Sequence, residues 1–412
     1  MKSLILYSLS FVFLTSAVQA APDWLQWRGP TRDGKIHKEA EPWPTSLTKD
    51  NLNELWSVPL AEGYASPILS GDRVFTVETK DKKFEIVRAF NRRTGIQLWE
   101  TSWAGSMKVP FFAAKNGSWV RSTPACDGKS LYVGGMRDVL AALDVATGKI
   151  RWVADFPKQE KTPKPQFGFV SSPLLDDGHV YVQVGTALRK IRKSDGKTMW
   201  KVLEDERAMF GSAFSSPVRA KIGGRDQIVV QTRMELGGIA PADGKVLWKT
   251  PVKAFRGMNI LTPSVVGNNL FTASHGGGSF WFTVNKKENQ QTVSQLWNGE
   301  VEGSMSSPVV IGGRIYLHGR DKRIHCLDPS KQQVLWSTGD LFGEYCSMVA
   351  HGNRILALDN RGYLLLIEAN PRRFKLIDKI EVSGRPTWAH LVVSGNELFI
   401  RDLKSLTAYR WK

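Results

Sequence analysis

The chain of 412 residues carries 56 lysines and arginines against 39 aspartates and glutamates, which gives a formal net charge of +17. Such an excess favours an acidic partner, either an anionic glycan or an acidic protein face, unless it only reflects a well-solvated surface. The chain carries no recognition module for nucleic acid, so we expect no nucleic-acid partner.

Residues 1–20 have the pattern of a secretory signal. Lys2 supplies the positive start, residues 4–14 form the apolar core, and residues 18–20 (Val-Gln-Ala) form a small-x-small cleavage site. The apolar run is too short for a permanent membrane span, and no later stretch is long enough to be one. Because no cysteine stands at the cleavage point, we expect a periplasmic or extracellular protein without a lipid anchor or a transmembrane segment.

Residues 21–50 are predicted to be an N-terminal extension, and a repeat follows them. In this repeat, tryptophan closes one short β-like segment after another, at intervals of 39 to 53 residues. These tryptophans are Trp56, Trp99, Trp152, Trp200, Trp248, Trp297 and Trp336. A period of this size with strand chemistry is typical of a β-propeller, in which each repeat is one four-stranded blade. We therefore predict one all-β propeller over residues 51–412.

Most repeats open on a Ser-Pro or Thr-Pro step, because proline is tolerated at the start of a strand. Six such steps contain Pro67, Pro124, Pro173, Pro217, Pro263 and Pro308. After each step we predict four strands, A to D, and the tryptophan ends strand D. Four of the turns between strands C and D carry a matching glycine, since a tight hairpin needs a residue that tolerates positive φ. These glycines are Gly95, Gly148, Gly196 and Gly244.

Two weaker repeats complete the count. The seventh blade is predicted to begin near residues 346–348, and its outer strand lies at residues 375–380. The eighth begins near residues 387–389 and ends one strand short, at residues 405–409. Residues 52–58 resemble a strand D with no other strand before it, and pairing them with the last blade closes the ring and removes an exposed edge. We predict eight four-stranded antiparallel blades; seven is the alternative if the seventh repeat is an insertion.

The seven repeated tryptophans are predicted to dock the blades structurally, and binding is expected on the loops. The D–A loops and the B–C turns emerge on one face, and two D–A loops, residues 101–121 and 153–170, are long. Eight residues are candidates for contact with a ligand or partner: Phe111, Phe112, Trp119, Arg121, Arg137, His275, Arg320 and Arg361. The alternatives are that the loops bury their own aromatic residues over the channel, and that the arginines pair with nearby aspartates.

No catalytic motif and no cluster with metal-ligand spacing occurs in the chain, so we assign no catalytic residue and no metal ligand. Three cysteines leave at least one of them unpaired. Cys326 and Cys346 lie in neighbouring blades and could form a disulfide, whereas Cys126 is remote in the ring. We expect all three to be buried free thiols, the commoner state of cysteine in a strand.

Two segments resemble the pyrroloquinoline-quinone-like (PQQ-like) propeller family. Residues 142–152 read Ala-Leu-Asp-Val-Ala-Thr-Gly-Lys-Ile-Arg-Trp and are similar to its tryptophan-docking repeat. Residues 24–30 read Trp-Leu-Gln-Trp-Arg-Gly-Pro and resemble a segment that begins many secreted members. The resemblance implies either a quinoprotein dehydrogenase, with PQQ and Ca²⁺ in the channel, or a non-enzymatic propeller like that of the outer-membrane barrel-assembly machinery. The chain has neither the adjacent cysteines of the first nor the lipid-bearing cysteine of the second, where Ala21 stands.

From these observations we expect a secreted or periplasmic, monomeric propeller that is not an enzyme and needs no cofactor. Its loop face would bind a protein or an anionic glycan. One alternative is a PQQ- and Ca²⁺-dependent dehydrogenase of alcohols or sugars. A second alternative is an accessory factor of outer-membrane barrel assembly.

Overall fold

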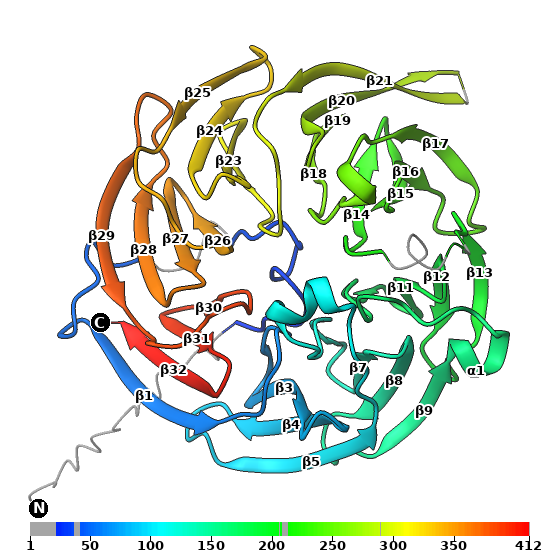
Figure 1. Cartoon of the computed structure of the whole chain (residues 1–412), viewed down its shortest axis with the longest axis vertical. Helices are drawn as coiled ribbons and strands as arrows, with labels where there is room; N and C mark the ends of the chain where they lie inside the picture. The colour runs from blue at the N-terminus through cyan, green and yellow to red at the C-terminus, as the bar shows by residue number, and fades with distance from the viewer. Residues whose placement is uncertain (1–21, 37–41, 206, 208–212, 289, 412) are drawn as a thin grey trace, which may run out of the picture.

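The computed structural model describes residues 22–36, 42–205, 207, 213–288 and 290–411, so the predicted signal sequence lies outside the described residues. Eight four-stranded antiparallel sheets surround a central axis as the blades of a propeller (Figure 1). This architecture confirms the predicted fold, and the seven-bladed alternative is wrong.

In blades 1 to 4 the four strands follow one another outward from the axis. Blade 1 consists of β2 (Ile68–Ser70), β3 (Arg73–Lys80), β4 (Phe84–Asn91) and β5 (Gln97–Ala104). Blade 2 consists of β6 (Ala125–Cys126), β7 (Ser130–Gly135), β8 (Val139–Asp144) and β9 (Ile150–Asp155). Blade 3 consists of β10 (Leu174–Leu175), β11 (His179–Val184), β12 (Ala187–Arg192) and β13 (Thr198–Val202). Blade 4 consists of β14 (Val218–Ile222), β15 (Arg225–Gln231), β16 (Glu235–Ile239) and β17 (Val246–Pro251).

Blades 5 to 7 repeat this order. Three short helical segments lie in D–A loops, between blades 1 and 2, blades 2 and 3, and blades 4 and 5. Blade 5 consists of β18 (Ser264–Val266), β19 (Asn269–Ser274), β20 (Gly278–Lys287) and β21 (Gln290–Gly299). Blade 6 consists of β22 (Val309–Ile311), β23 (Arg314–His318), β24 (Ile324–Asp328) and β25 (Gln333–Ser337). Blade 7 consists of β26 (Cys346–His351), β27 (Arg354–Asp359), β28 (Tyr363–Glu368) and β29 (Lys375–Glu381). The helical segments are η1 (Phe111–Asn116), α1 (Phe156–Glu160) and η2 (Phe255–Gly257).

Blade 8 is built from both ends of the described chain. It contains β30 (Val392–Ser394), β31 (Glu397–Arg401) and β32 (Ser405–Trp411), and its outer strand is β1 (Leu52–Pro59). Figure 1 shows β1 beside β32, and the two strands pair antiparallel from Leu52 opposite Trp411 to Pro59 opposite Ser405. The predicted closure is therefore present. The predicted start of blade 8 near residues 387–389 is wrong, because these residues belong to the loop before β30.

The repeated tryptophan contacts the following blade. The Trp99 indole Nε1 donates a hydrogen bond to Val145 O at 3.0 Å, across the boundary between blades 1 and 2. Gly148 lies against the face of the same indole, and a Cβ atom there would be 2.5 Å from Trp99 Cε3. Its φ of +72° also favours glycine. The glycine of the C–D turn therefore makes room for the tryptophan of the preceding blade.

The other tryptophans follow this geometry to different degrees. Gly95, Gly196 and Gly244 lie against Trp56, Trp152 and Trp200 in the same way. Trp248 donates instead to Gln227 Oε1 of its own blade at 2.7 Å, and Trp336 donates to Asn370 O of blade 7 at 2.8 Å. Trp336 therefore makes the same contact with the C–D turn of the following blade as Trp99 does, although that turn has no glycine. Trp248 differs because it donates within its own blade.

The apolar core is divided into clusters that lie mainly between neighbouring blades. One cluster joins Phe75 and Val87 of blade 1 to Leu131 and Ala141 of blade 2, and similar clusters occur around the ring. Burial of one such aliphatic or aromatic side chain contributes roughly 1.5–3 kcal/mol to stability. Within the described ranges, no helix has the length and apolar character needed to cross a bilayer.

Candidate functional site

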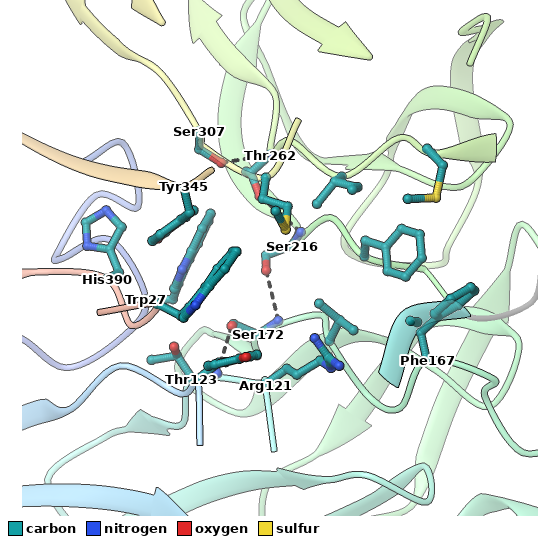
Figure 2. A pocket seen from close by; sticks show the side chains of 18 residues that line it. Trp27, Arg121, Thr123, Phe167, Ser172, Ser216, Thr262, Ser307, Tyr345 and His390 are labelled. Atoms are coloured by element: carbon teal, nitrogen blue, oxygen red, sulfur yellow. Dashed lines mark hydrogen bonds between the residues drawn. The ribbon is translucent and has the colours of Figure 1, made fainter. Parts of the chain in front are cut away.

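A cavity of about 240 Å³ lies on the propeller axis (Figure 2). Trp27 of the N-terminal extension contributes to its lining, and every other lining residue comes from a segment that leads into strand A of a blade. All eight blades contribute, so the cavity is part of the central channel. Its lining residues belong to the D–A loops, so it lies on the side of the ring that carries these loops and the B–C turns, here called the loop face.

The deeper part of the lining belongs to a ring of hydroxyl groups that joins the blades, and all its members except Ser66 line the cavity. Its members are the residues before proline in the six Ser/Thr-Pro steps: Ser66, Thr123, Ser172, Ser216, Thr262 and Ser307. From Thr123 to Ser307, each hydroxyl oxygen accepts a hydrogen bond from the backbone N–H of the preceding member, at 2.9–3.2 Å. These bonds satisfy buried backbone groups at the channel wall. We call this set the hydroxyl ring.

Blade 7 keeps a hydroxyl residue at this position, Ser347, whose oxygen accepts a hydrogen bond from Leu391 N at 3.1 Å, whereas blade 8 has His390. Here the linkage changes, because Cys346 N donates to the preceding Ser306 hydroxyl at 2.9 Å and Ser66 Oγ donates to His390 O at 2.7 Å. The His390 Nδ1–H faces Leu391 O at 2.8 Å. Burial lowers the pKa of His390 to about 3, so its ring is neutral near pH 7.

A second set of lining residues lies two positions before the hydroxyl ring, nearer the loop face. Its members are Tyr64, Arg121, Val170, Phe214, Ile260, Met305, Tyr345 and Trp388. The spacing of two places them on the same side of an extended chain as the hydroxyl ring. We call this set the upper ring. Trp388 lies between two tyrosines, with ring centres 5.5 Å from Tyr64 and 5.9 Å from Tyr345.

Arg121 is the only lining residue with a permanent charge, and all lining residues lie in the described part of the chain. Its Nη2 donates to Gly117 O at 2.8 Å, and its guanidinium lies 5.5 Å from the centre of the Tyr64 ring. Its buried Nε has no hydrogen-bond partner, and no carboxylate of the described residues pairs with it. Burial lowers the pKa of Arg121, because the charged form loses hydration. Figure 2 shows Arg121 between Phe167 on one side and the group of Trp27, Tyr345 and His390 on the other.

Residues 22–36, here called the plug segment, cross the centre of the ring (Figure 1), and Trp27 of this segment lines the cavity. Arg28 is fully buried and donates through Nη2 to Pro308 O of blade 6. Arg32 donates to Ser172 O at 2.9 Å and to Pro173 O at 2.6 Å in blade 3. Burial lowers the pKa of these guanidinium groups to about 10 and about 9, so both remain charged at neutral pH.

Backbone hydrogen bonds attach the plug segment to further blades. Trp24 pairs with Leu69 of blade 1 at 3.0 Å, and Cys126 N of blade 2 donates to Leu25 O at 2.8 Å. At the other end, Ala350 N of blade 7 donates to Gly34 O at 2.7 Å. The plug segment is thus bonded to blades 1, 2, 3, 6 and 7.

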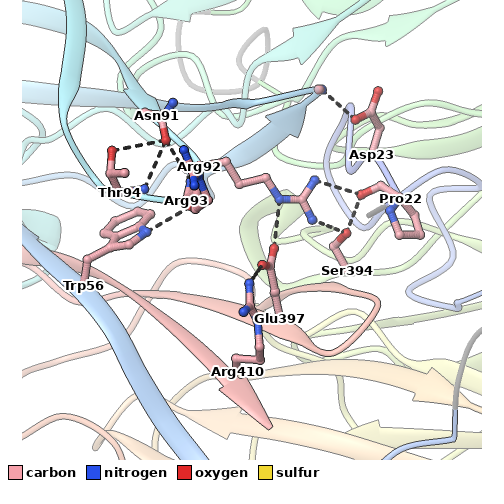
Figure 3. A network of polar contacts seen from close by, with 11 residues as sticks. Pro22, Asp23, Trp56, Asn91, Arg92, Arg93, Thr94, Ser394, Glu397 and Arg410 are labelled. Atoms are coloured by element: carbon pink, nitrogen blue, oxygen red, sulfur yellow. Dashed lines mark hydrogen bonds and ion pairs between the residues drawn. The ribbon is translucent and has the colours of Figure 1, made fainter. Parts of the chain in front are cut away.

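A buried arginine joins the start of the plug segment to the closure of the ring (Figure 3). Arg92 of blade 1 donates to Glu397 Oε2 at 2.9 Å and to Ser394 Oγ at 2.6 Å, both in blade 8. Its Nη1 donates to Pro22 O at 3.2 Å, and Arg410 forms a second ion pair with Glu397 at 2.7 Å. One network therefore links blade 1, blade 8 and the plug segment.

On the loop face, aromatic side chains extend from solvent to the cavity wall. Phe111 and Phe112 of η1 are 90% and 58% exposed. Their ring centres are 5.6 Å apart, and the Phe112 ring lies 6.1 Å from Phe167, which itself lies 5.4 Å from Phe214. Phe167 and Phe214 both line the cavity. We call these four phenylalanines the aromatic path.

The predicted binding residues of the long loops lie in and around this site. Arg121 lines the cavity, and Trp119 packs just outside the lining against Tyr64, with ring centres 5.4 Å apart. Phe111 and Phe112 belong to the aromatic path. The predicted loop of residues 153–170 contributes Phe167 and Val170 to the lining, and it also contains α1, which the sequence did not predict.

The structure does not bring together the predicted residues of the B–C turns. None of them lines the cavity: Arg137, His275, Arg320 and Arg361. Arg320 pairs with Glu302 at 3.4 Å, and Arg361 pairs with Asp359 at 2.7 Å. Pairing with a nearby aspartate, the alternative stated for the arginines, describes Arg361, whereas Arg320 pairs with a glutamate.

Sequence reasoning missed most of the upper ring and Trp27. The signal was present, because each member of the upper ring in a Ser/Thr-Pro blade stands two residues before the hydroxyl residue. The Ser/Thr-Pro step predicts only the start of strand A, and the strand does begin there in all six blades. Because side chains alternate along an extended chain, the residue two positions before the hydroxyl residue lies on the same side of the chain, toward the cavity.

The residues of the channel do not fit Ca²⁺ and a quinone. The lining contains no carboxylate, and in the part of the chain that the structure describes no three His, Cys, Asp or Glu residues form a group that could hold a metal ion. Ca²⁺ takes six to eight oxygen ligands, commonly from carboxylates.

The three cysteines, Cys126, Cys326 and Cys346, are buried and free, so the alternative disulfide is not formed.

Eight blades with repeated tryptophan docking define the chain as a PQQ-like β-propeller. Over residues 82–338 it matches the family described as outer membrane protein assembly factor BamB, and it belongs to that family. It is similar to this factor from Yersinia pestis, with 24% identity over 363 residues that cover 83% of this chain and 85% of the relative. It is similar also to that of Escherichia coli, with 23% identity over 368 residues that cover 84% and 86%.

Solved structures show the same fold. The crystal structure of BamB from Moraxella catarrhalis has a TM-score of 0.63 at 15% identity, covering 88% of this chain and 98% of that chain. Quinohemoprotein alcohol dehydrogenase from Comamonas testosteroni has a TM-score of 0.62 at 13% identity, covering 94% of this chain and 80% of that chain. These identities are too low to transfer a function, and the shared feature is the propeller.

Proposed function

We propose that this chain is a non-catalytic periplasmic propeller that binds a polypeptide through its loop face and assists the assembly of outer-membrane proteins. The family supports the proposal, because related proteins are described as outer membrane protein assembly factors. The predicted export signal supports the periplasmic location. Of the functions considered from sequence, the barrel-assembly alternative is favoured over binding of a glycan.

The observation that carries the proposal is the aromatic path from Phe111 to the cavity. An aromatic side chain that is 90% exposed leaves a large apolar surface in water, and contiguous exposed apolar surface often marks a binding site. Aromatic residues that surround a pocket are also the residues that contribute most to protein–protein affinity. Such a surface suits the apolar side chains of a polypeptide better than the polyhydroxylated surface of a glycan.

The decisive experiment is a pull-down with the tagged mature protein from an envelope extract of the source cell, with and without a reversible cross-linker. We expect recovery of a component of the outer-membrane barrel-assembly machinery. The double substitution F111S/F112S should reduce this recovery at least several-fold, because both rings are exposed and contribute little to folding.

Ile96→Ser is the matched control. Ile96 is 65% exposed, but it lies at the C–D turn, which emerges on the face opposite the loop face. Its substitution should leave recovery unchanged. If no barrel-assembly component is recovered, the role in assembly is wrong. If F111S/F112S and I96S recover equal amounts, the partner does not bind through the aromatic path.

A further inference from the structure

The Arg121 guanidinium is a cation at the wall of an apolar cavity, and none of the described carboxylates is its partner. Apart from the hydroxyl ring and His390, the groups around it are aromatic or aliphatic. A cation that has lost hydration is stabilised by a carboxylate far more than by a carbonyl or an aromatic face alone. Arg28 and Arg32 do not compete for an anion in the cavity, because their guanidinium groups donate to the backbone carbonyls of Pro308 and Ser172 in the blades.

The rest of the upper ring provides an apolar site of suitable size for one aromatic group. An apolar protein cavity of roughly 150 Å³ is able to bind benzene, and this cavity measures about 240 Å³. Met258, Ile260 and Met305 line the cavity on its aliphatic side. Methionine adapts its shape to different ligands, which suits a site that accepts more than one sequence.

We propose that the cavity binds an aromatic side chain of the partner polypeptide and that Arg121 pairs with a carboxylate next to that side chain. This inference rests on the proposed function, because it names the chemical feature of the polypeptide that the loop face would recognise. The carboxylate has two sources in a polypeptide, namely an adjacent Asp or Glu, or the C-terminus when the aromatic residue is the last one. Both sources place an anion within one residue of the aromatic side chain that enters the cavity.

The approach to the cavity supports a polypeptide as the occupant. A segment that inserts one side chain at the axis must cross the loop face, where the aromatic path provides further apolar contact. Its first two rings, Phe111 and Phe112, are exposed, and its last two, Phe167 and Phe214, line the cavity. The formal charge of +17 favours the approach of an acidic segment.

The test uses isothermal titration of the purified mature protein with short synthetic peptides. The probe peptide carries an Asp-Phe pair between Gly-Ser spacers and has blocked ends. Its comparison peptides replace Asp with Asn, replace Phe with Ala, or end on Phe with a free carboxylate or an amide. Phenylacetate provides the same chemistry without a polypeptide. We expect binding of the Asp-Phe peptide, of the free C-terminal Phe peptide, or of both, and these arms identify the source of the carboxylate.

Arg121→Gln should weaken binding of the acidic peptide roughly tenfold to hundredfold, the usual effect of losing a hydrogen bond to a charged group. It should change the affinity for the Asn-Phe peptide less than twofold. Arg121→Lys retains the charge and should restore part of the affinity. Met305→Trp fills the cavity and should abolish binding of every Phe peptide, which tests the site even if R121Q disturbs its loop. Arg93→Gln, an exposed arginine in a C–D turn, is the control and should change nothing.

Four results would overturn the inference. The first two are equal affinity of R121Q and wild type for the acidic peptides, and retained binding of the Phe peptides in M305W. The other two are binding of phenylacetate as tightly as the peptides, and no binding of any peptide. These outcomes are separate from the pull-down. If the cavity bound no peptide, recovery of a barrel-assembly component that requires Phe111 and Phe112 would still support the proposed function.

Discussion

Replacing Gly148 with alanine tests whether the C–D glycine is required by the tryptophan of the preceding blade. The substitution has two costs. A φ of +72° is unfavourable for a residue with a Cβ atom, which costs about 1 kcal/mol. The Cβ atom would also lie 2.5 Å from Trp99 Cε3, so the indole must move, and such overpacking costs about 1–3 kcal/mol. We expect G148A to lower the free energy of unfolding by about 2–4 kcal/mol.

Gly313→Ala isolates the second cost. Gly313 has a φ of +75°, almost the same as Gly148, but no atom lies within 4 Å of the position that its Cβ would occupy. We therefore expect G313A to cost about 1 kcal/mol, the backbone contribution alone.

The assay is equilibrium urea unfolding of the mature protein, followed by far-UV circular dichroism and by tryptophan fluorescence. Both substitutions are compared at the same pH and salt concentration. A loss of stability in G148A that exceeds the loss in G313A by about 1–3 kcal/mol would support the docking contact. Equal losses would refute the reasoning, because the glycine would then be needed only for its backbone conformation.

Three further changes test other parts of the structure. Burial raises the pKa of Asp138 to about 7, so ionisation of this carboxyl opposes folding increasingly as the pH rises from about 4 to 7. The variant Asp138→Asn should therefore be more stable than wild type at pH 8, by up to roughly 4 kcal/mol. Urea unfolding midpoints should show that this advantage shrinks toward pH 5. Arg28→Ala should loosen the plug segment, and hydrogen exchange at the Ala350 amide should become faster by tenfold or more. Glu397→Gln removes a buried partner of Arg92 and should lower the free energy of unfolding by about 3 kcal/mol in urea titrations, and no change would mean that the network does not stabilise the closure.

The blades were predictable because their signals are local. Trp152 and Gly148 lie within one hairpin of each other, and both recur with the repeat, so a single chain reveals them. The closure of blade 8 was predictable by counting strands, since β1 had no other partner. The start of β30 was misplaced because blade 8 has no Ser/Thr-Pro step, and His390 stands where the hydroxyl residue would be.

The candidate site was predictable only in part, because its contacts join residues far apart in the chain. The arginine of the Trp-Arg-Gly-Pro segment was noted as a family feature, but its partner Pro308 belongs to blade 6. The sequence indicates Arg121 as a basic residue on a long loop, whereas the absence of a partner among the carboxylates that the structure describes follows only from the packing around it. Exposed positions such as Arg320 gave a misleading pattern, since a turn at an equivalent place in the repeat need not point to the axis.

The pairing of β1 with β32 has a consequence for how the protein is made. The strand at residues 52–59 is synthesised near the beginning, and its partner at residues 405–411 is synthesised last. Until then β1 is an open edge that other strands could join. A helper that shields nascent β1 would therefore act during most of translation and export, and premature termination before residue 405 would leave a chain prone to aggregation rather than a smaller functional ring.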